Sequence, residues 1–310
     1  MLNRRILRIK AFKVLYSYTG NRTMTLKEAL SALDISCEAT RDLYLYLLSI
    51  VGPLTAEAVR RTEAARNKFN PTEEERNPNL KFVQNALAPL LEADPDFQKL
   101  LERKHLSWDQ DDAFVHQLYE TVKTRPYFEE YMSAPEVSLA QDVRLFKSIF
   151  ENEFEDDEAL SQILEDRSIY WMDDLGYALS WVVRSLDHIA RTGRWEYPPL
   201  YQSDILAAQG KAVDSDRQFV TKLLSAAFGS FDTYYDKVAG SVQGWDRDRL
   251  FMTDMVLIVM GLAEAEHFPE IPVKVTINEY VEISKFYSTP KSRSFVNGLL
   301  DRLIKSFRQL

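Results

Sequence analysis

The stretch FVNGLLDRL, residues 295–303, decides how the C-terminal part of this chain is interpreted. Its Asn297-Gly298 pair is a strong signal for a β-hairpin turn. The apolar residues around that pair nevertheless recur at helical spacing: Phe295, Val296, Leu299, Leu300, Leu303 and Phe307. No alternating strand follows, so we predict a helix over about 290–307, with Thr289 as N-cap and Pro290 at its first position. A glycine within a helix costs about 1 kcal/mol relative to alanine, which is tolerable where another backbone or a ligand must come close.

Most of the remaining chain also has helical periodicity. Over residues 3–18 one apolar stripe recurs every three to four positions, and it consists of Leu7, Ala11, Val14, Leu15 and Tyr18. Further helices are predicted at about 25–33, 38–67, 80–92, 108–123, 139–154, 168–191, 216–242, 248–266 and 273–286. No segment alternates convincingly as a strand would, so the predicted fold class is all-α.

The apolar runs are too short to predict a membrane span. The longest, MVLIVMGLA at 255–263, lies between Asp254 and Glu264, whereas a spanning helix needs about 20 apolar residues. The first 18 residues carry Arg and Lys in every turn, and the single cysteine, Cys37, excludes an internal disulfide. We therefore expect a cytoplasmic protein.

Charge is distributed unevenly along the chain. Residues 1–27 carry seven basic and no acidic side chains, and residues 285–310 have a net charge of +5. Since the whole chain carries −9, the part between them carries −21. Two basic ends of this kind suggest an anionic partner, although contacts between the ends and the acidic middle of the same molecule would use the same charges.

No constellation of catalytic or metal-binding residues is visible. Glycine-rich phosphate loops and nucleophile elbows are missing, and the four histidines are scattered without a second ligand at helical spacing. The acidic run ENEFEDDE at 151–158 lacks the alternating ligands of a calcium loop and is interpreted as a solvated face. The sequence thus predicts no catalytic site, no metal site and no cofactor.

Residues 245–303 resemble the C-terminal half of the transcription antitermination factor family NusB. The matching positions run through Ile-Pro, Val-x-Ile-Asn-Glu-x-Val-Glu and Phe-Val-Asn-Gly-x-Leu-Asp motifs: Asp254, Glu264, Ile271, Pro272, Val275, Ile277, Asn278, Glu279, Val281, Glu282, Lys285, Phe295, Val296, Asn297, Gly298, Leu300 and Asp301. The N-terminus resembles the opening of the same family through Arg4, Arg5, Arg8, Ala11, Leu15 and Tyr16. This resemblance implies a NusB-like pair of helical bundles, formed by residues 1–33 and 216–310, with residues 34–215 as a large helical, acidic insertion.

The resemblance also implies a function. Members of the family bind single-stranded boxA RNA in ribosomal RNA transcripts together with the ribosomal protein NusE, within the RNA polymerase antitermination complex, and they are not enzymes. Carried over to this chain, RNA binding falls on Arg4, Arg5, Arg8, Tyr16, Lys285, Arg293, Phe295 and Asn297. Partner binding falls on Asp254, Glu264, Glu279 and Glu282. Gly298 is expected to let the helix pack closely beneath Phe295 and Asn297.

Two other functions are compatible with the sequence. An acidic helical scaffold with weak or no RNA binding would use the insertion to hold a basic protein. An RNA-modifying enzyme is the second, because a NusB-like domain also precedes some methyltransferases, but the chain has no glycine loop for a methyl donor.

Overall fold

The computed structural model describes residues 1–202, 204–206, 211–213, 215–242 and 251–308. The chain divides into two compact units, one formed by Met1–Cys37 with Pro199–Leu310 and the other by Glu38–Pro198. We call them the NusB-like unit and the inserted unit. The sequence predicted an insertion over residues 34–215. The inserted unit is shorter, because it begins at Glu38 and ends at Pro198.

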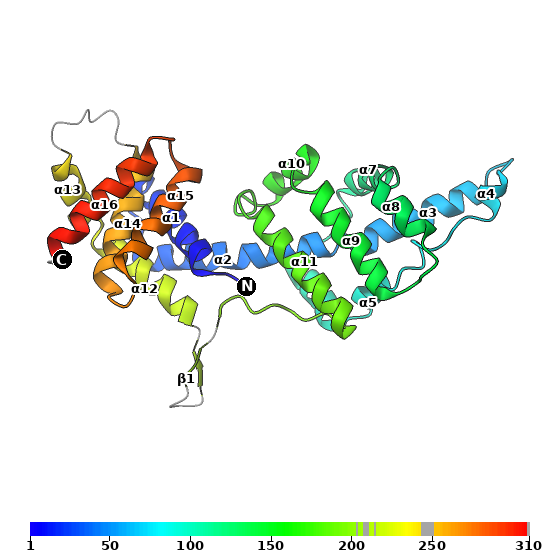
Figure 1. Cartoon of the computed structure of the whole chain (residues 1–310), viewed down its shortest axis with the longest axis horizontal. Helices are drawn as coiled ribbons and strands as arrows, with labels where there is room; N and C mark the ends of the chain where they lie inside the picture. Colours follow the sequence, from blue (N-terminus) through cyan, green and yellow to red (C-terminus); the bar gives the residue numbers. More distant parts are fainter. Residues whose placement is uncertain (203, 207–210, 214, 243–250, 309–310) are drawn as a thin grey trace. The chain divides into compact units, whose positions relative to one another are not determined.

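The NusB-like unit is a helical bundle built from two segments that lie far apart in the sequence (Figure 1). Its elements are α1 (Arg4–Gly20), the first part of α2 (Leu26–Leu48), β1 (Asp204–Leu206), β2 (Lys211–Val213), α12 (Ser215–Gly229), α13 (Phe231–Ser241), α14 (Met252–His267), α15 (Val273–Tyr287) and α16 (Ser292–Arg308). Helix α14 packs against α1, α12, α13, α15 and α16. Because it is apolar on every side, all of its residues from Asp254 to Ala265 are buried, as expected of a central helix.

The inserted unit is a second helical bundle. It contains the last part of α2 and α3 (Val51–Arg66), α4 (Glu73–Arg76), α5 (Leu87–Glu92), α6 (Pro95–Lys104), α7 (Asp112–Val122), α8 (Pro126–Ser133), α9 (Leu139–Glu153), α10 (Glu158–Arg167) and α11 (Leu175–Thr192). Aromatic rings fill part of its core, where Tyr46 stacks on Trp108 with ring centroids 4.1 Å apart and on Trp171 at 5.3 Å. Such a core can offset the conformational entropy lost when the insertion becomes ordered.

The all-α class is confirmed, with corrections in detail. Helix α2 continues where a break was predicted at 34–37, and the predicted helix at 216–242 is interrupted at Ser230. Four short helices, α4, α6, α8 and α10, were not predicted. The expectation of no strand was wrong, since β1 and β2 pair antiparallel with Ile205 opposite Ala212.

The helix that carries FVNGLLDRL exists, and Asn297-Gly298 lies inside it. It begins at Ser292, two residues later than the predicted start, and Thr289 and Pro290 belong to the turn before it. The helical spacing of the apolar residues therefore outweighs the local turn preference of Asn-Gly, because Val296, Leu299 and Leu300 become buried.

Candidate nucleic-acid interface

Helix α1 places its arginines at the start of the chain. The side chain of Asn3 accepts a hydrogen bond from the backbone N–H of Ile6 at 3.0 Å and caps the helix. Arg4, Arg5 and Arg8 follow within the first two turns, and all three contact carboxylates of the same unit.

Arg8 is buried in the bundle. Its Nε and Nη2 donate to the two carboxylate oxygens of Glu264 on α14, at 2.7 and 2.9 Å. Thr276 and Tyr280 of α15 donate to the same carboxylate at 2.9 and 3.1 Å. Burial acts to lower the pKa of Arg8, but the hydrogen bonds to Glu264 and the neighbouring acidic charge raise it overall, so the guanidinium stays charged. This network joins α1, α14 and α15.

Arg4 and Arg5 are half-exposed and pair at the edge of the bundle. Arg5 donates to both oxygens of Glu279 at 2.9 and 2.7 Å, and these hydrogen bonds lower the pKa of the Glu279 carboxyl and raise that of Arg5. Arg4 donates to Asp216 at 3.2 Å through Nε only. Part of the basic N-terminus is thus paired with acidic residues of the same molecule. The charge distribution along the sequence had left this possibility open beside an anionic partner.

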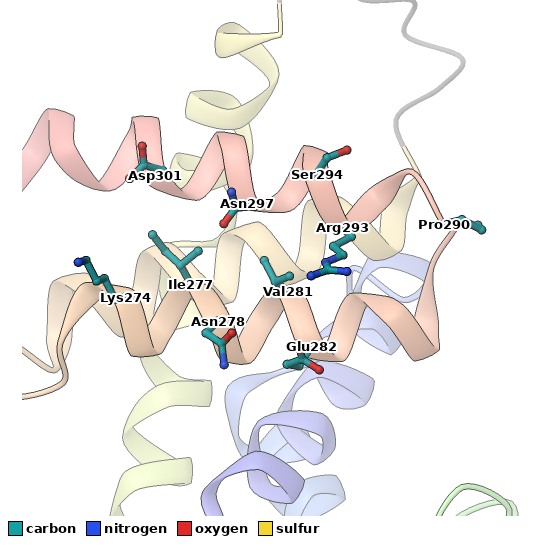
Figure 2. A pocket seen from close by; sticks show the side chains of 10 residues that line it. All are labelled: Lys274, Ile277, Asn278, Val281, Glu282, Pro290, Arg293, Ser294, Asn297 and Asp301. Carbon is teal, nitrogen blue, oxygen red and sulfur yellow. The ribbon is translucent and has the colours of Figure 1, made fainter.

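A groove of about 610 Å³ lies between α15 and α16 (Figure 2). It is lined by Lys274, Ile277, Asn278, Val281, Glu282, Pro290, Arg293, Ser294, Asn297 and Asp301. Figure 2 shows Arg293 and Asn297 reaching from α16 toward α15, whereas Ile277 and Val281 point from α15 toward α16. The groove therefore combines an apolar floor with two cations, Lys274 and Arg293, two carboxylates, Glu282 and Asp301, and amide groups that can donate and accept hydrogen bonds.

A second groove, of about 580 Å³, lies on the other side of α15. Its lining includes Arg4, Arg5, Pro272, Val275 and Glu279. Helix α15 forms the ridge between the two grooves, because residues 278 and 282 line one groove and residues 275 and 279 line the other. The basic start of α1 thus borders the same helix as the α15–α16 groove.

The other predicted RNA-binding residues, Tyr16, Lys285 and Phe295, differ in their exposure and in their contacts. Tyr16 is 43% exposed and its ring lies 6.1 Å from that of Phe12, which in turn contacts Tyr287 at the end of α15. Lys285 is exposed and pairs with Glu282 at 2.6 Å. Phe295 is half-buried and does not line the groove beside Asn297.

Sequence reasoning missed Phe286, the most exposed aromatic residue among those whose burial is described in the NusB-like unit. Its side chain is 81% exposed. It lies one helical turn beyond Glu282 in the row of Asn278 and Glu282, so it neighbours a residue of the α15–α16 groove without belonging to the groove lining. The sequence contained a signal for this, because Tyr280, Ile283 and Tyr287 mark the inward stripe of α15 and Phe286 lies off it.

Three predicted contact residues have to be corrected. Arg8 and Glu264 are buried against each other; Arg8 borders the second groove with only 3% of its surface exposed, and its guanidinium pairs with Glu264. Asp254 is also buried, and it accepts a hydrogen bond from Ser292 at 2.6 Å, which links α14 to the start of α16. Of the four acidic residues predicted for partner binding, Glu279 and Glu282 retain exposed surface.

The predicted role of Gly298 is also wrong. A Cβ atom at Gly298 would meet no other atom within 4 Å, so no element packs closely there. The close approach occurs at Gly261 of α14, where a Cβ would lie 2.6 Å from Leu300 Cδ2 and 3.2 Å from Tyr280 Cδ2. Gly261 therefore permits α14 to contact α15 and α16, and Gly298 leaves an open surface on α16.

Two further features bear on the site. Among the described residues, no group of three His, Cys, Asp or Glu side chains could hold a metal ion. One helical segment, Leu26–Arg66, is long and apolar enough to be compared with a membrane span. Of its most apolar stretch of 18 residues, 67% is buried inside the structure. That degree of burial is typical of a core helix.

Comparison with known proteins agrees with this arrangement. The model of the NusB family matches residues 196–305. A transcription antitermination protein NusB from Methylacidiphilum infernorum is 33% identical over 111 residues, 36% of this chain and 69% of that protein. Proteins of the same name from Clostridium botulinum and Pseudothermotoga lettingae are 31% and 27% identical, over 74% and 87% of their lengths and 34% and 53% of this chain. No solved structure matches.

A bundle with this helix order and these motif residues defines a NusB-type helical protein. The chain belongs to the NusB family.

Proposed function

We propose that this protein is a transcription antitermination factor and not an enzyme, that its RNA is single-stranded and boxA-like, and that it acts with the ribosomal protein NusE in the RNA polymerase antitermination complex. The proposal rests on family membership and on one observation. Six of the residues that carry the family resemblance line the α15–α16 groove: Ile277, Asn278, Val281, Glu282, Asn297 and Asp301.

The surface around this groove suits single-stranded RNA. Phe286 offers an exposed ring on which a base can stack, and Asn278 and Asn297 can hydrogen-bond to base edges. Arg293 and Lys285 supply positive charge beside the groove for phosphates. Arg4 and Arg5 continue the positive surface beyond α15, since each guanidinium keeps N–H groups that its carboxylate partner does not use.

We assign NusE contact to the partly exposed acidic residues Glu279 and Glu282, since a ribosomal protein is basic as a class and these carboxylates lie on the ridge between the grooves. A partner held there adds RNA contacts of its own. The two proteins then bind one RNA more tightly than either does alone, because the second contact is made at high effective concentration.

The experiment is a binding series with labelled boxA-like RNA, with and without purified NusE. Asn297→Ala and Arg293→Ala are compared with Arg144→Ala, which removes an exposed cation from the inserted unit. We expect weaker RNA binding for the first two variants and unchanged binding for the third. Equal affinity of all three variants and the unaltered protein would exclude the groove as the RNA site.

The partner assignment has its own test. Glu282→Lys is expected to weaken NusE binding without RNA, whereas Glu129→Lys, an equal charge change at an exposed position of the inserted unit, is expected to leave it unchanged. If both substitutions weaken NusE binding equally, attraction to the overall negative charge explains it and the assignment fails.

A further inference from the structure

The inserted unit contains a groove that neither the family nor the proposed RNA site explains. It has a volume of about 390 Å³ and lies between the start of α3, α5, α6 and the segment at 106–109. Its apolar lining includes Leu91, Phe97, Leu101, Leu106 and Trp108. This region lies outside residues 196–305, which match the NusB family.

The walls of this groove are fixed by hydrogen bonds. His105 adopts a left-handed backbone conformation at the end of α6, with φ of 54°, and the backbone N–H of Leu106 donates to Leu101 O at 2.9 Å. The indole of Trp108 donates to Tyr46 O at 2.9 Å and stacks on the Tyr46 ring. The groove is therefore preformed, and a ligand need not order these segments on binding.

The rim of the groove carries charge of one sign. Glu92, Glu102 and Asp109 line it, and no Lys or Arg does. Within the described chain these three exposed carboxylates have no ion pair, which distinguishes them from the paired Glu57 and Glu153 of the same unit. Glu92 lies over the first turn of α3, since a Cβ at Gly52 would come within 3.2 Å of its Oε1, and the helix dipole partly offsets that charge.

We propose that this groove binds a basic segment of a partner protein, in which Lys or Arg residues flank an apolar side chain. The apolar floor takes the apolar side chain, and the carboxylates pair with the flanking cations. A metal ion does not explain the rim, because no three carboxylate or imidazole groups of the described residues are close enough to hold one. The inserted unit as a whole, with 31 acidic and 18 basic residues and hence a net charge of −13, steers the same kind of partner toward it.

The test uses the full-length protein and a labelled peptide in which Arg and Lys flank a central Leu-Phe pair. Two comparison peptides carry Glu in place of each Arg and Lys, or Ser in place of Leu and Phe. We expect binding of the first peptide, none of the acidic peptide, and clearly weaker binding of the Ser peptide. Equal binding of the Leu-Phe and Ser peptides would overturn the proposal, because the apolar floor would then contribute nothing.

A charge-matched pair of protein variants locates the site. The variant Glu92→Gln/Glu102→Gln/Asp109→Asn removes the rim charges, and Glu129→Gln/Glu130→Gln/Asp156→Asn removes three exposed charges elsewhere on the same unit. At low salt we expect peptide affinity to fall roughly tenfold for the rim variant, as for three exposed ion pairs, and to stay unchanged for the other. An equal loss in both variants would show diffuse attraction to an acidic surface and would refute the groove.

Discussion

Arg8 and Glu264, which are 256 positions apart in the sequence, form a buried bidentate ion pair that ties the first helix to the central helix α14. The pair explains why a motif rich in arginine contributes to stability as well as to charge. Two carboxylate oxygens receive four hydrogen bonds from Arg8, Thr276 and Tyr280, so the cost of burying the charges is offset by near-complete hydrogen bonding.

Removing one member of this pair is expected to be far more harmful than removing both. Glu264→Gln leaves the buried guanidinium with only the more distant carboxylate of Glu279, 3.7 Å from its Nη1, and we expect a loss of about 3 kcal/mol in the free energy of unfolding. Arg8→Met/Glu264→Met removes both charges and should lose less. Urea denaturation followed by circular dichroism measures both values. If the double variant is no more stable than Glu264→Gln, the two residues do not act as a pair.

The two glycines of α14 and α16 are expected to respond in opposite directions to alanine. Gly261→Ala forces a Cβ against Leu300 and Tyr280, and overpacking of this kind costs about 1 to 3 kcal/mol, partly offset by higher helix propensity. Gly298→Ala meets open space and should stabilise the helix by up to about 1 kcal/mol. Thermal unfolding of both variants checks this, and the prediction fails if Gly298→Ala is the more destabilising one.

RNA binding by the NusB-like unit is expected to depend on salt with a slope set by four cations. If Arg4, Arg5, Lys285 and Arg293 each neutralise one phosphate, the slope of log affinity against log salt is roughly −3, at about −0.7 per phosphate of a single strand. Arg293→Ala should reduce the slope by about 0.7. A titration series in increasing KCl gives both slopes, and a slope near zero for the unaltered protein contradicts the electrostatic assignment.

Stacking of a base is expected on Phe286 and not on Phe295. Phe286→Ala should weaken RNA binding by about 1 to 3 kcal/mol, because its ring is exposed beside the groove. Phe295→Ala changes a half-buried side chain, so its main effect should be on the unfolding free energy. The reverse result, a larger loss of RNA affinity for Phe295→Ala, would restore the assignment made from sequence.

The stability of the inserted unit is expected to fall in acid through Glu57. Burial acts to raise the pKa of this carboxyl, but hydrogen bonds from Arg61, Arg60 and His116 outweigh it and lower the pKa to about 2. Because the pKa of Glu57 is lower in the folded than in the unfolded protein, its ionised carboxylate stabilises the folded state at pH values above 4.5. That contribution to the free energy of unfolding disappears as the pH falls toward 2.

Glu57→Gln should therefore reduce stability at neutral pH by about 1.5 to 3 kcal/mol and flatten its dependence on pH below 4.5. Tryptophan fluorescence reports this unfolding well, since Trp108, Trp171, Trp181 and Trp195 all belong to the inserted unit. Glu129→Gln, which alters an exposed carboxyl, is the control. An unchanged acid transition in Glu57→Gln would remove Glu57 as its cause.

Sequence periodicity predicted the fold class and the helix around Asn297-Gly298 because apolar spacing reflects burial directly. It did not predict that Arg8 would be buried, since that depends on a carboxylate supplied by a distant helix. Periodicity also could not distinguish Gly261 from Gly298. Both lie within helices, but only Gly261 lies against side chains of neighbouring helices. Arg293 and Asn297 are exposed, and their predicted contact with RNA stays a prediction; the groove that joins them to Asn278 depends on how α15 packs on α16.

The distance along the chain between α1 and α14 also has a consequence during protein synthesis. Helix α1 leaves the ribosome before α14, and its buried face and the counter-charge of Arg8 are supplied by residues made after the whole inserted unit. The inserted unit, whose residues are contiguous, can complete its core while the C-terminal third is still being made. Until Glu264 has been translated, the nascent chain therefore carries an amphipathic helix with unpaired arginines, which must remain soluble or be shielded by a chaperone.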